Sequence, residues 1–87
     1  MLDNYLLYNS WPSLDLHGYD RESARVAIND FIKDNLIMKN KYIVVIHGIG
    51  SGVIREATIN TLKVNKSVKA YKISNFNPGM TVIELDI

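Results

Sequence analysis

Hydrophobic and polar positions follow one another along the chain in an order that predicts four strands. A short alternation at about 13–17 predicts the first strand, and a continuous apolar run at 42–46, rich in β-branched residues, predicts a central strand covered on both faces. Segments 68–74 and 80–87 predict two further strands. The turn-forming residues at 75–79 connect these two, which favours antiparallel pairing between them.

Helical periodicity fills the two segments between the first three predicted strands. The first helix is predicted from its N-cap at Asp20 to about Met38, with an end near Asn40, a residue that tolerates the left-handed conformation. The second is predicted over about 53–64. The positions expected to face the core are Ala24, Ala27, Ile28, Phe31 and Ile32 in the first helix, and Ile54, Ala57, Thr61 and Leu62 in the second.

The element order β-α-β-α-β-β predicts an α/β fold; the closer description, an α+β two-layer sandwich, is what a family resemblance described below implies. We expect a mostly parallel four-stranded sheet with right-handed crossovers, two helices packed against it and the last strand antiparallel. Residues 13–87 form the domain, and residues 1–12, rich in leucine and aromatic side chains, are expected to form an N-terminal arm that packs on it.

Composition narrows the class of protein. With 87 residues, 47% of them hydrophobic, the chain is predicted to be one compact domain. The absence of cysteine excludes disulfides, thiolate zinc sites and a cysteine nucleophile, and is compatible with a reducing, cytoplasmic location. No apolar run approaches the roughly 18 residues of a transmembrane helix and no signal peptide is evident, so we expect neither export nor a membrane partner.

Charge is unevenly distributed although the net charge is only +1. Residues 39–75 carry seven basic side chains and one acidic one, while the flanking segments are acidic overall. A locally basic face suits a partner that bears phosphates, because binding releases condensed counterions. The alternative is that these lysines are only the solvated faces of strands and helices.

Two histidine motifs lie thirty residues apart, Asp15-Leu16-His17-Gly18 and His47-Gly48-Ile49-Gly50-Ser51-Gly52. Side chains alternate along a strand, so Asp15 and His17 are expected on one face near the end of the first strand. His47 ends the second predicted strand. Since ligands bind beyond the C-terminal ends of parallel strands, we expect both motifs to form one site.

The residue types of this predicted site suit phosphate chemistry. Alternating glycines before a helix offer backbone N–H groups to an anion, although the turn could also serve backbone geometry alone. The spacing matches neither a dinucleotide fingerprint nor a nucleoside-triphosphate loop, so no nucleotide cofactor is expected. The predicted phosphate-binding residues on the turn and the helix after it are Gly48, Gly50, Ser51, Gly52 and Arg55, to which Lys41 and Lys72 of the basic segment are added.

Proton transfer is the chemistry expected of His17 and His47, because imidazole titrates near neutral pH and can exchange a proton with an attacking or leaving oxygen. Asp15 is expected to orient an imidazole or to bind a divalent cation, Mg²⁺ or Mn²⁺. The three residues Asp15, His17 and His47 are the predicted catalytic set. A structural zinc site is not expected without thiolates or close ligand spacing.

The two motifs in this order, followed by Ile54-Arg55, resemble the Smr (small MutS-related) domain over about residues 13–87. The resemblance implies a two-layer sandwich similar to the C-terminal domain of a bacterial translation initiation factor. It also implies nucleic-acid binding, with endonuclease activity on DNA or RNA, linked to DNA repair or recombination or to messenger RNA on stalled ribosomes. No ATPase segment is present, so a stand-alone member is expected.

The chain departs from the family pattern at two places. Ile49 stands where a basic residue is common, which removes a phosphate contact. The loop before the last strand is short, so only Gly79 and Thr81 match the family's substrate-binding residues there. The leading hypothesis is an endonuclease that is a monomer or weak dimer. The alternative is a module that binds nucleic acid or the ribosome without catalysing a reaction. A third hypothesis is a protein-interaction domain.

Overall fold

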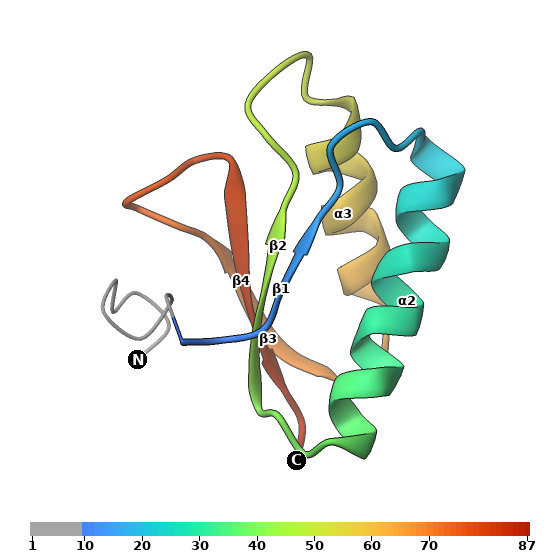
Figure 1. Ribbon diagram of the computed structural model, residues 1–87, viewed down its shortest axis with the longest axis vertical. Coiled ribbons are helices and arrows are strands. Elements are labelled where there is room, and N and C mark those ends of the chain that lie inside the picture. The colour runs from blue at the N-terminus through green and yellow to red at the C-terminus, as the bar shows by residue number, and fades with distance from the viewer. Residues whose placement is uncertain (1–9) are drawn as a thin grey trace.

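The computed structural model describes residues 10–87, which form one sheet with two helices on one side of it (Figure 1). The observed element order is the predicted β-α-β-α-β-β. Among the described residues no helix is long and apolar enough to cross a membrane. The strands are β1 (Ser13–Asp15), β2 (Tyr42–Ile46), β3 (Val68–Ile73) and β4 (Met80–Leu85), and the helices are α2 (Arg21–Ile37) and α3 (Val53–Val64).

The sheet has the strand order β1-β2-β4-β3. β1 pairs with β2 in parallel, and β4 pairs antiparallel with both β2 and β3. Three strands therefore run in one direction and only the last is reversed, as predicted. The sheet is nevertheless mixed, because β4 lies between β2 and β3 and leaves β1 and β2 as the parallel neighbours. This interior place suits the strongly apolar sequence of β4, which is buried along most of its length.

β1 is shorter than the predicted strand and ends at Asp15. The backbone N–H of Leu16 still donates to the carbonyl of Ile46 at 2.9 Å, so the chain follows β2 for one residue more. Gly18 then takes φ +81°, a left-handed conformation that turns the chain toward α2. His17 consequently lies in the loop after the strand rather than within it.

The start of α2 is as predicted and its end differs by one residue. The Asp20 side chain accepts a hydrogen bond from the Ser23 N–H at 2.7 Å, and this contact lowers the pKa of the Asp20 carboxyl. At the other end Lys39, not Asn40, adopts the left-handed conformation, with φ +61°. The Asn40 side chain donates from its amide to Oδ1 of Asn35 at 2.9 Å.

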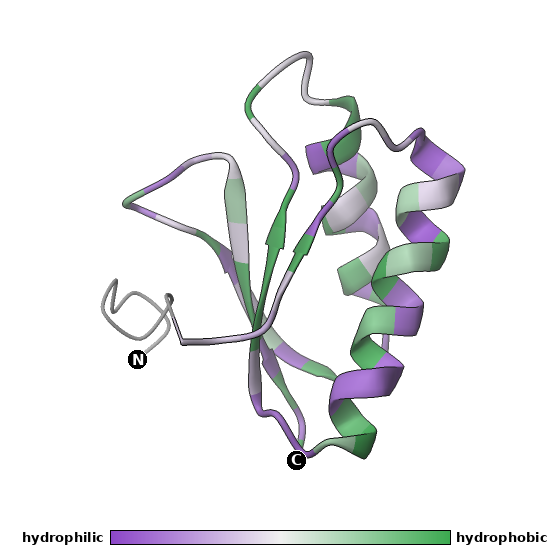
Figure 2. Cartoon of the chain, viewed as in Figure 1, coloured by the Kyte–Doolittle hydropathy of each residue, from purple (hydrophilic) through white to green (hydrophobic). Residues whose placement is uncertain are grey.

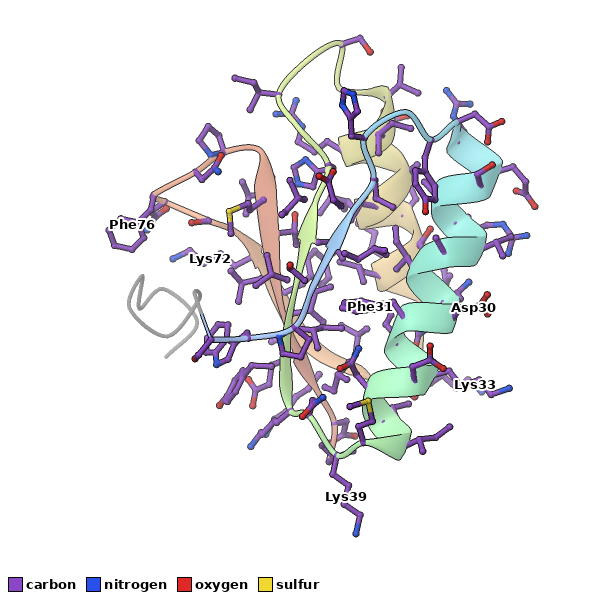
Figure 3. All side chains as sticks on the ribbon, in the orientation of Figure 1. Asp30, Phe31, Lys33, Lys39, Lys72 and Phe76 are labelled. Atoms are coloured by element: carbon purple, nitrogen blue, oxygen red, sulfur yellow. The ribbon has the colours of Figure 1, made fainter. Side chains whose placement is uncertain are left out.

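The core fills the space between the sheet and the two helices. Figure 2 shows hydrophobic residues along β2 and on the side of α2 that faces the sheet. In Figure 3, Phe31 points toward the sheet, whereas Asp30 and Lys33 point to the opposite side. The predicted inward positions of both helices are buried or pack against this core. Its fully buried members are Leu16, Ala24, Ile28, Ile32, Ile43, Val45, Leu62, Ile83 and Leu85.

The predicted N-terminal arm is described only at residues 10–12; its segment 1–9 lies outside the described residues. Trp11 stacks on Tyr42 with ring centroids 4.9 Å apart. The carbonyl of Pro12 accepts a hydrogen bond from the Val44 N–H at 2.9 Å, which extends the pairing of β1 with β2 backwards by one residue.

Candidate functional site

A hollow of about 240 Å³ opens at the C-terminal ends of β1 and β2. It is lined by Asp15, His17, Ile46, His47 and Gly48. The parallel register places Asp15 beside Ile46, so the residues that follow each strand emerge next to one another. The structure therefore brings together the two histidine motifs that the sequence places thirty residues apart.

Asp15 contacts the backbone of His17 and not its ring. The Asp15 carboxylate accepts a hydrogen bond from the His17 N–H at 2.9 Å. The predicted carboxylate–imidazole contact is thus not formed; the backbone turn after β1 presents its own amide to the carboxylate instead. The His17 side chain is exposed, and within residues 10–87 its ring makes no hydrogen bond. The ring is accessible to a ligand in the hollow.

His47 is half-buried and bonded at both ring nitrogens. Nδ1 lies 2.9 Å from the carbonyl oxygen of Gly48, and Nε2 lies 2.8 Å from Oγ1 of Thr81. Burial lowers the pKa of His47, and the positive charge of Arg55 acts in the same direction, against the opposing effect of the Gly48 carbonyl. These two effects favour the neutral imidazole, and both of its nitrogens have partners within the protein.

The backbone N–H of Gly48, the first in the glycine turn, is also hydrogen-bonded within the protein. The carbonyl of Gly79 accepts hydrogen bonds from the backbone N–H of His47 at 2.9 Å and of Gly48 at 3.0 Å. Gly48 was predicted to offer its N–H to a phosphate, and this is corrected: the loop between β3 and β4 already occupies that donor. Gly48 instead contributes its φ of +78°, which a residue with a side chain adopts only with strain.

The rest of the turn leads directly into α3. Gly50 and Ser51 are exposed, and Gly52, with φ +88°, is the N-cap of the helix without any side-chain hydrogen bond. The first N–H groups of a helix have no partner within it. The Val53 N–H of α3 lies 3.5 Å from the Ser51 hydroxyl, and this end of the helix presents the positive end of its dipole. The predicted phosphate-binding role of Gly50, Ser51 and Gly52 is compatible with this placement.

Arg55 lies in the first turn of α3, and its side chain is exposed. Its guanidinium folds back over the turn, since a Cβ added to Gly52 would meet Nη2 of Arg55 at 3.4 Å. After burial, the positive charge of Arg55 is a further cause of the lowered pKa of His47. Arg55 is therefore the cation that the structure places beside the glycine turn.

Two residues predicted to contact substrate are buried instead. Gly79 and Thr81 belong to the β3–β4 loop and the start of β4, and Thr81 has no exposed surface. A phosphate cannot reach either residue directly. The Gly79 carbonyl and the Thr81 hydroxyl contact His47 and Gly48, the residues that follow β2, so both support the site from its buried side.

Two predicted lysines lie away from the hollow. Lys41 precedes β2 at the opposite end of that strand from His47, and its ammonium lies 3.6 Å from a carboxylate oxygen of Glu84. Lys72 is on β3, the other edge strand of the sheet from β1, and points to the helix-free side (Figure 3). The sequence put both on a basic segment, but the strand order separates them from the site.

No cluster of metal ligands is found among residues 10–87, and the binding of Mg²⁺ or Mn²⁺ by Asp15 stays a prediction. Within residues 10–87 no group of three or more His, Cys, Asp or Glu side chains lies close enough to hold one. The Asp15 carboxylate, which was predicted to bind Mg²⁺ or Mn²⁺, is engaged by the His17 amide. We therefore derive no chemical step through a metal.

The support given by β4 is the part of the site that the sequence motifs did not reveal. Thr81 and Gly79 were recognised as motif positions, but their partners depend on β4 lying beside β2. The register pairs Val45 with Thr81 and Ile46 with Met80. These contacts follow from the strand order of the sheet, which local sequence patterns do not predict.

Fold and site together define a class of protein: a two-layer domain in which adjacent parallel strands end in an Asp-x-His motif and in a His-Gly turn that opens a helix. Residues 14–86 match the family model described as the Smr domain. The chain belongs to the Smr domain family.

Similar curated proteins are the endonucleases MutS2 of several bacteria. The chain is 38% identical over 76 residues to Endonuclease MutS2 of Clostridium acetobutylicum, a match that covers 84% of the chain and 10% of that protein. It is 37% identical over 68 residues to Endonuclease MutS2 of Ligilactobacillus salivarius, covering 78% and 9% respectively. The chain thus spans about a tenth of the length of these relatives.

Two solved structures share the fold. The Smr domain of Thermus thermophilus MutS2 aligns with a TM-score of 0.84 and 22% identity, covering 87% of this chain and 99% of that one. YdaL, a stand-alone small MutS-related protein from Escherichia coli, aligns with a TM-score of 0.81 and 23% identity, covering 86% and 64%. At these identities the likeness establishes the fold, and the chemistry must be argued from the residues of this chain.

Proposed function

We propose that the protein is a nucleic-acid endonuclease that cleaves phosphodiester bonds in the hollow at the ends of β1 and β2. The single observation that carries this proposal is the placement of an exposed imidazole, His17, in the same hollow as the start of the glycine turn, with Arg55 beside that turn. Similarity to the endonucleases MutS2 supports the same class of activity.

The phosphate-binding part of the site combines a helix start with a cation. The first amides of α3 and the exposed turn before it attract an anion, and the guanidinium of Arg55 can bind phosphate oxygens in a bidentate manner. These groups act where charge develops on the phosphorus-bound oxygens in the transition state. They hold the phosphate near the hollow that the His17 ring faces.

Proton transfer falls to His17, because His47 is already bonded at both nitrogens. RNA suits such a site, because its 2′-hydroxyl supplies a nucleophile next to the phosphate. Cleavage then requires mainly a general base and a general acid. His17 takes the proton of the 2′-hydroxyl, whose oxygen bonds to phosphorus. The bond to the 5′-oxygen breaks, and His17 returns a proton to that oxygen. The products are a 2′,3′-cyclic phosphate and a 5′-hydroxyl.

A cleavage assay with matched substrates tests the proposal. The purified chain is incubated with single-stranded RNA, with DNA of the same sequence and with supercoiled plasmid, each with and without a chelator. We expect RNA to be cut in the presence of chelator, with cyclic phosphate ends, and His17→Ala to slow cleavage by about 10²–10⁴-fold. Lys41→Ala, at the far end of β2, is the control that should cut like wild type.

The remaining outcomes of this assay decide between functions. Cleavage of DNA but not RNA, or only with added Mg²⁺ or Mn²⁺, would contradict the mechanism through the 2′-hydroxyl. Binding without cleavage of any substrate would instead support a non-catalytic binding module. Cleavage that is equal in wild type and His17→Ala would place the activity outside this hollow.

A further inference from the structure

The two hydrogen bonds of the His47 ring fix where its hydrogen lies. A backbone carbonyl can only accept, so the contact between Nδ1 and the Gly48 oxygen requires the hydrogen on Nδ1. In a neutral ring Nε2 is then an acceptor. The donor that faces it is the hydroxyl of Thr81, at 2.8 Å.

Thr81 reaches His47 because of the register between β4 and β2. Thr81 pairs with Val45, and His47 is two residues further along, so the three side chains lie toward the same, helix-covered face of the sheet. Thr81 has no exposed surface, and its hydroxyl cannot exchange its partner for water. Burying a hydroxyl costs free energy unless it is hydrogen-bonded, which favours the contact with His47.

Burial and the charge of Arg55 favour the neutral form of His47, while the Gly48 carbonyl favours the protonated form. Arg55, from α3, is positive, while Asp15 and His17 share the hollow on the β1 side. β4 contributes the uncharged Thr81. Burial and the Arg55 charge both lower the pKa of His47, so both oppose protonation of the ring as the pH falls toward 6.

We propose that Thr81 is a positioning residue of this site: its buried hydroxyl donates to Nε2 of His47 and so holds the ring against the Gly48 carbonyl, and the ring in turn anchors the glycine turn that follows. The inference rests on the proposed function, because the turn it positions is the proposed phosphate-binding element. It also assigns His47 to holding the turn and leaves His17 as the ring that transfers protons.

Nitrogen-15 NMR of the histidine rings tests the hydrogen-bonding part directly, in the full chain and without any substrate. We expect His47 of the wild type to show a protonated Nδ1 and a bare Nε2 at pH 7. Thr81→Val keeps the shape of the side chain but removes the hydroxyl, so Nε2 of His47 should stay bare and its resonance should move to the position of a nitrogen that accepts no hydrogen bond. Thr81→Ser retains the hydroxyl and should keep the Nε2 resonance at its wild-type position.

RNA binding and cleavage by the same variants test the functional part. Thr81→Val should lower the affinity for single-stranded RNA, or the cleavage rate, on the order of tenfold, with Thr81→Ser close to wild type.

The outcomes separate this inference from the proposed function. An Nε2–H form of His47 in the wild type, or Thr81→Ser as defective as Thr81→Val, overturns the inference whether or not RNA is cut. An Nδ1–H form with reduced RNA binding in Thr81→Val and recovery in Thr81→Ser supports it even where no cleavage occurs. Unchanged binding and cleavage in Thr81→Val overturn it.

Discussion

The Asp15 carboxylate accepts a hydrogen bond from the backbone N–H of His17 at 2.9 Å. The contact spans the end of β1 and closes the turn that carries the His17 ring into the hollow. The two polar residues of the motif therefore have different tasks. The carboxylate positions the backbone, and the ring is left exposed for a ligand.

Replacement of Asp15 by asparagine separates positioning from chemistry. The side-chain carbonyl of Asp15→Asn can still accept from the His17 N–H, so we expect cleavage of RNA to be reduced only severalfold, the difference between a charged and a neutral acceptor. Asp15→Ala, which has no acceptor, should lose much more. If the carboxylate itself moved a proton or held a metal, the asparagine variant would be as inactive as the alanine variant.

Arg55 is expected to set the affinity for the nucleic-acid backbone. Removing its guanidinium in Arg55→Ala takes away one phosphate contact, so single-stranded RNA should bind about tenfold more weakly. The slope of log affinity against log salt should fall by about 0.7. Fluorescence anisotropy at several salt concentrations measures both.

Lys41→Ala is the matched control for Arg55→Ala, because it removes one positive charge that already lies 3.6 Å from Glu84. We expect it to leave the salt slope unchanged. Equal slopes for the two variants would mean that Arg55 acts only through the general charge of the domain.

Close packing of the β3–β4 loop against the glycine turn makes Gly79 intolerant of a side chain. A Cβ at Gly79 would lie 3.2 Å from the Cα of Gly48 and 3.2 Å from Oδ1 of Asn77. Gly79→Ala should therefore lower the free energy of unfolding by about 1–3 kcal/mol, as overpacking does. At Gly50 a Cβ meets nothing within 4 Å, so Gly50→Ala should leave the melting temperature nearly unchanged. A larger loss in Gly50→Ala than in Gly79→Ala would contradict the described loop packing.

The N-cap of α2 gives a dependence of stability on pH. The hydrogen bond from the Ser23 N–H lowers the pKa of Asp20 in the folded state. The carboxylate thus stabilises the fold above the ordinary aspartate pKa of about 4, and this contribution is lost as the pH falls through the lowered value. Asp20→Asn keeps a capping oxygen that does not titrate. We expect the melting temperature of wild type to fall relative to Asp20→Asn between pH 5 and pH 2, and parallel melting curves over that range would refute the assignment.

Much of the fold could be predicted because the local patterns are strong. The apolar run of β2, the Asp20 cap and the glycine turn before α3 each define an element boundary with a physical cause close by in sequence. The two motifs were placed at one edge of the sheet because parallel strands joined by a helix end on the same side. The element boundaries and the placement of the two motifs therefore depend only on local sequence patterns and on the handedness of the crossovers.

The missed parts depend on which strands become neighbours. Insertion of β4 between β2 and β3 decides that Thr81 and Gly79 support the site and that Lys72 lies on the far edge strand. Lys41 and Lys72 were included for their charge alone, and charge along the chain does not specify the end or edge of a sheet. The Asp15 contact was misassigned because the short turn after β1 brings a backbone N–H to the carboxylate before the ring can reach it.

The central claim, that His17 transfers protons in this hollow while His47 holds the glycine turn, is tested most directly by chemical rescue. Single-turnover cleavage of single-stranded RNA is measured for His17→Ala and His47→Ala with increasing imidazole in solution. We expect imidazole to restore cleavage in His17→Ala, whose ring faces the open hollow, and to leave His47→Ala unaffected, since a solvent molecule does not rebuild the contacts with Gly48 and Thr81. Rescue of His47→Ala without rescue of His17→Ala would reverse the two assignments and contradict the account.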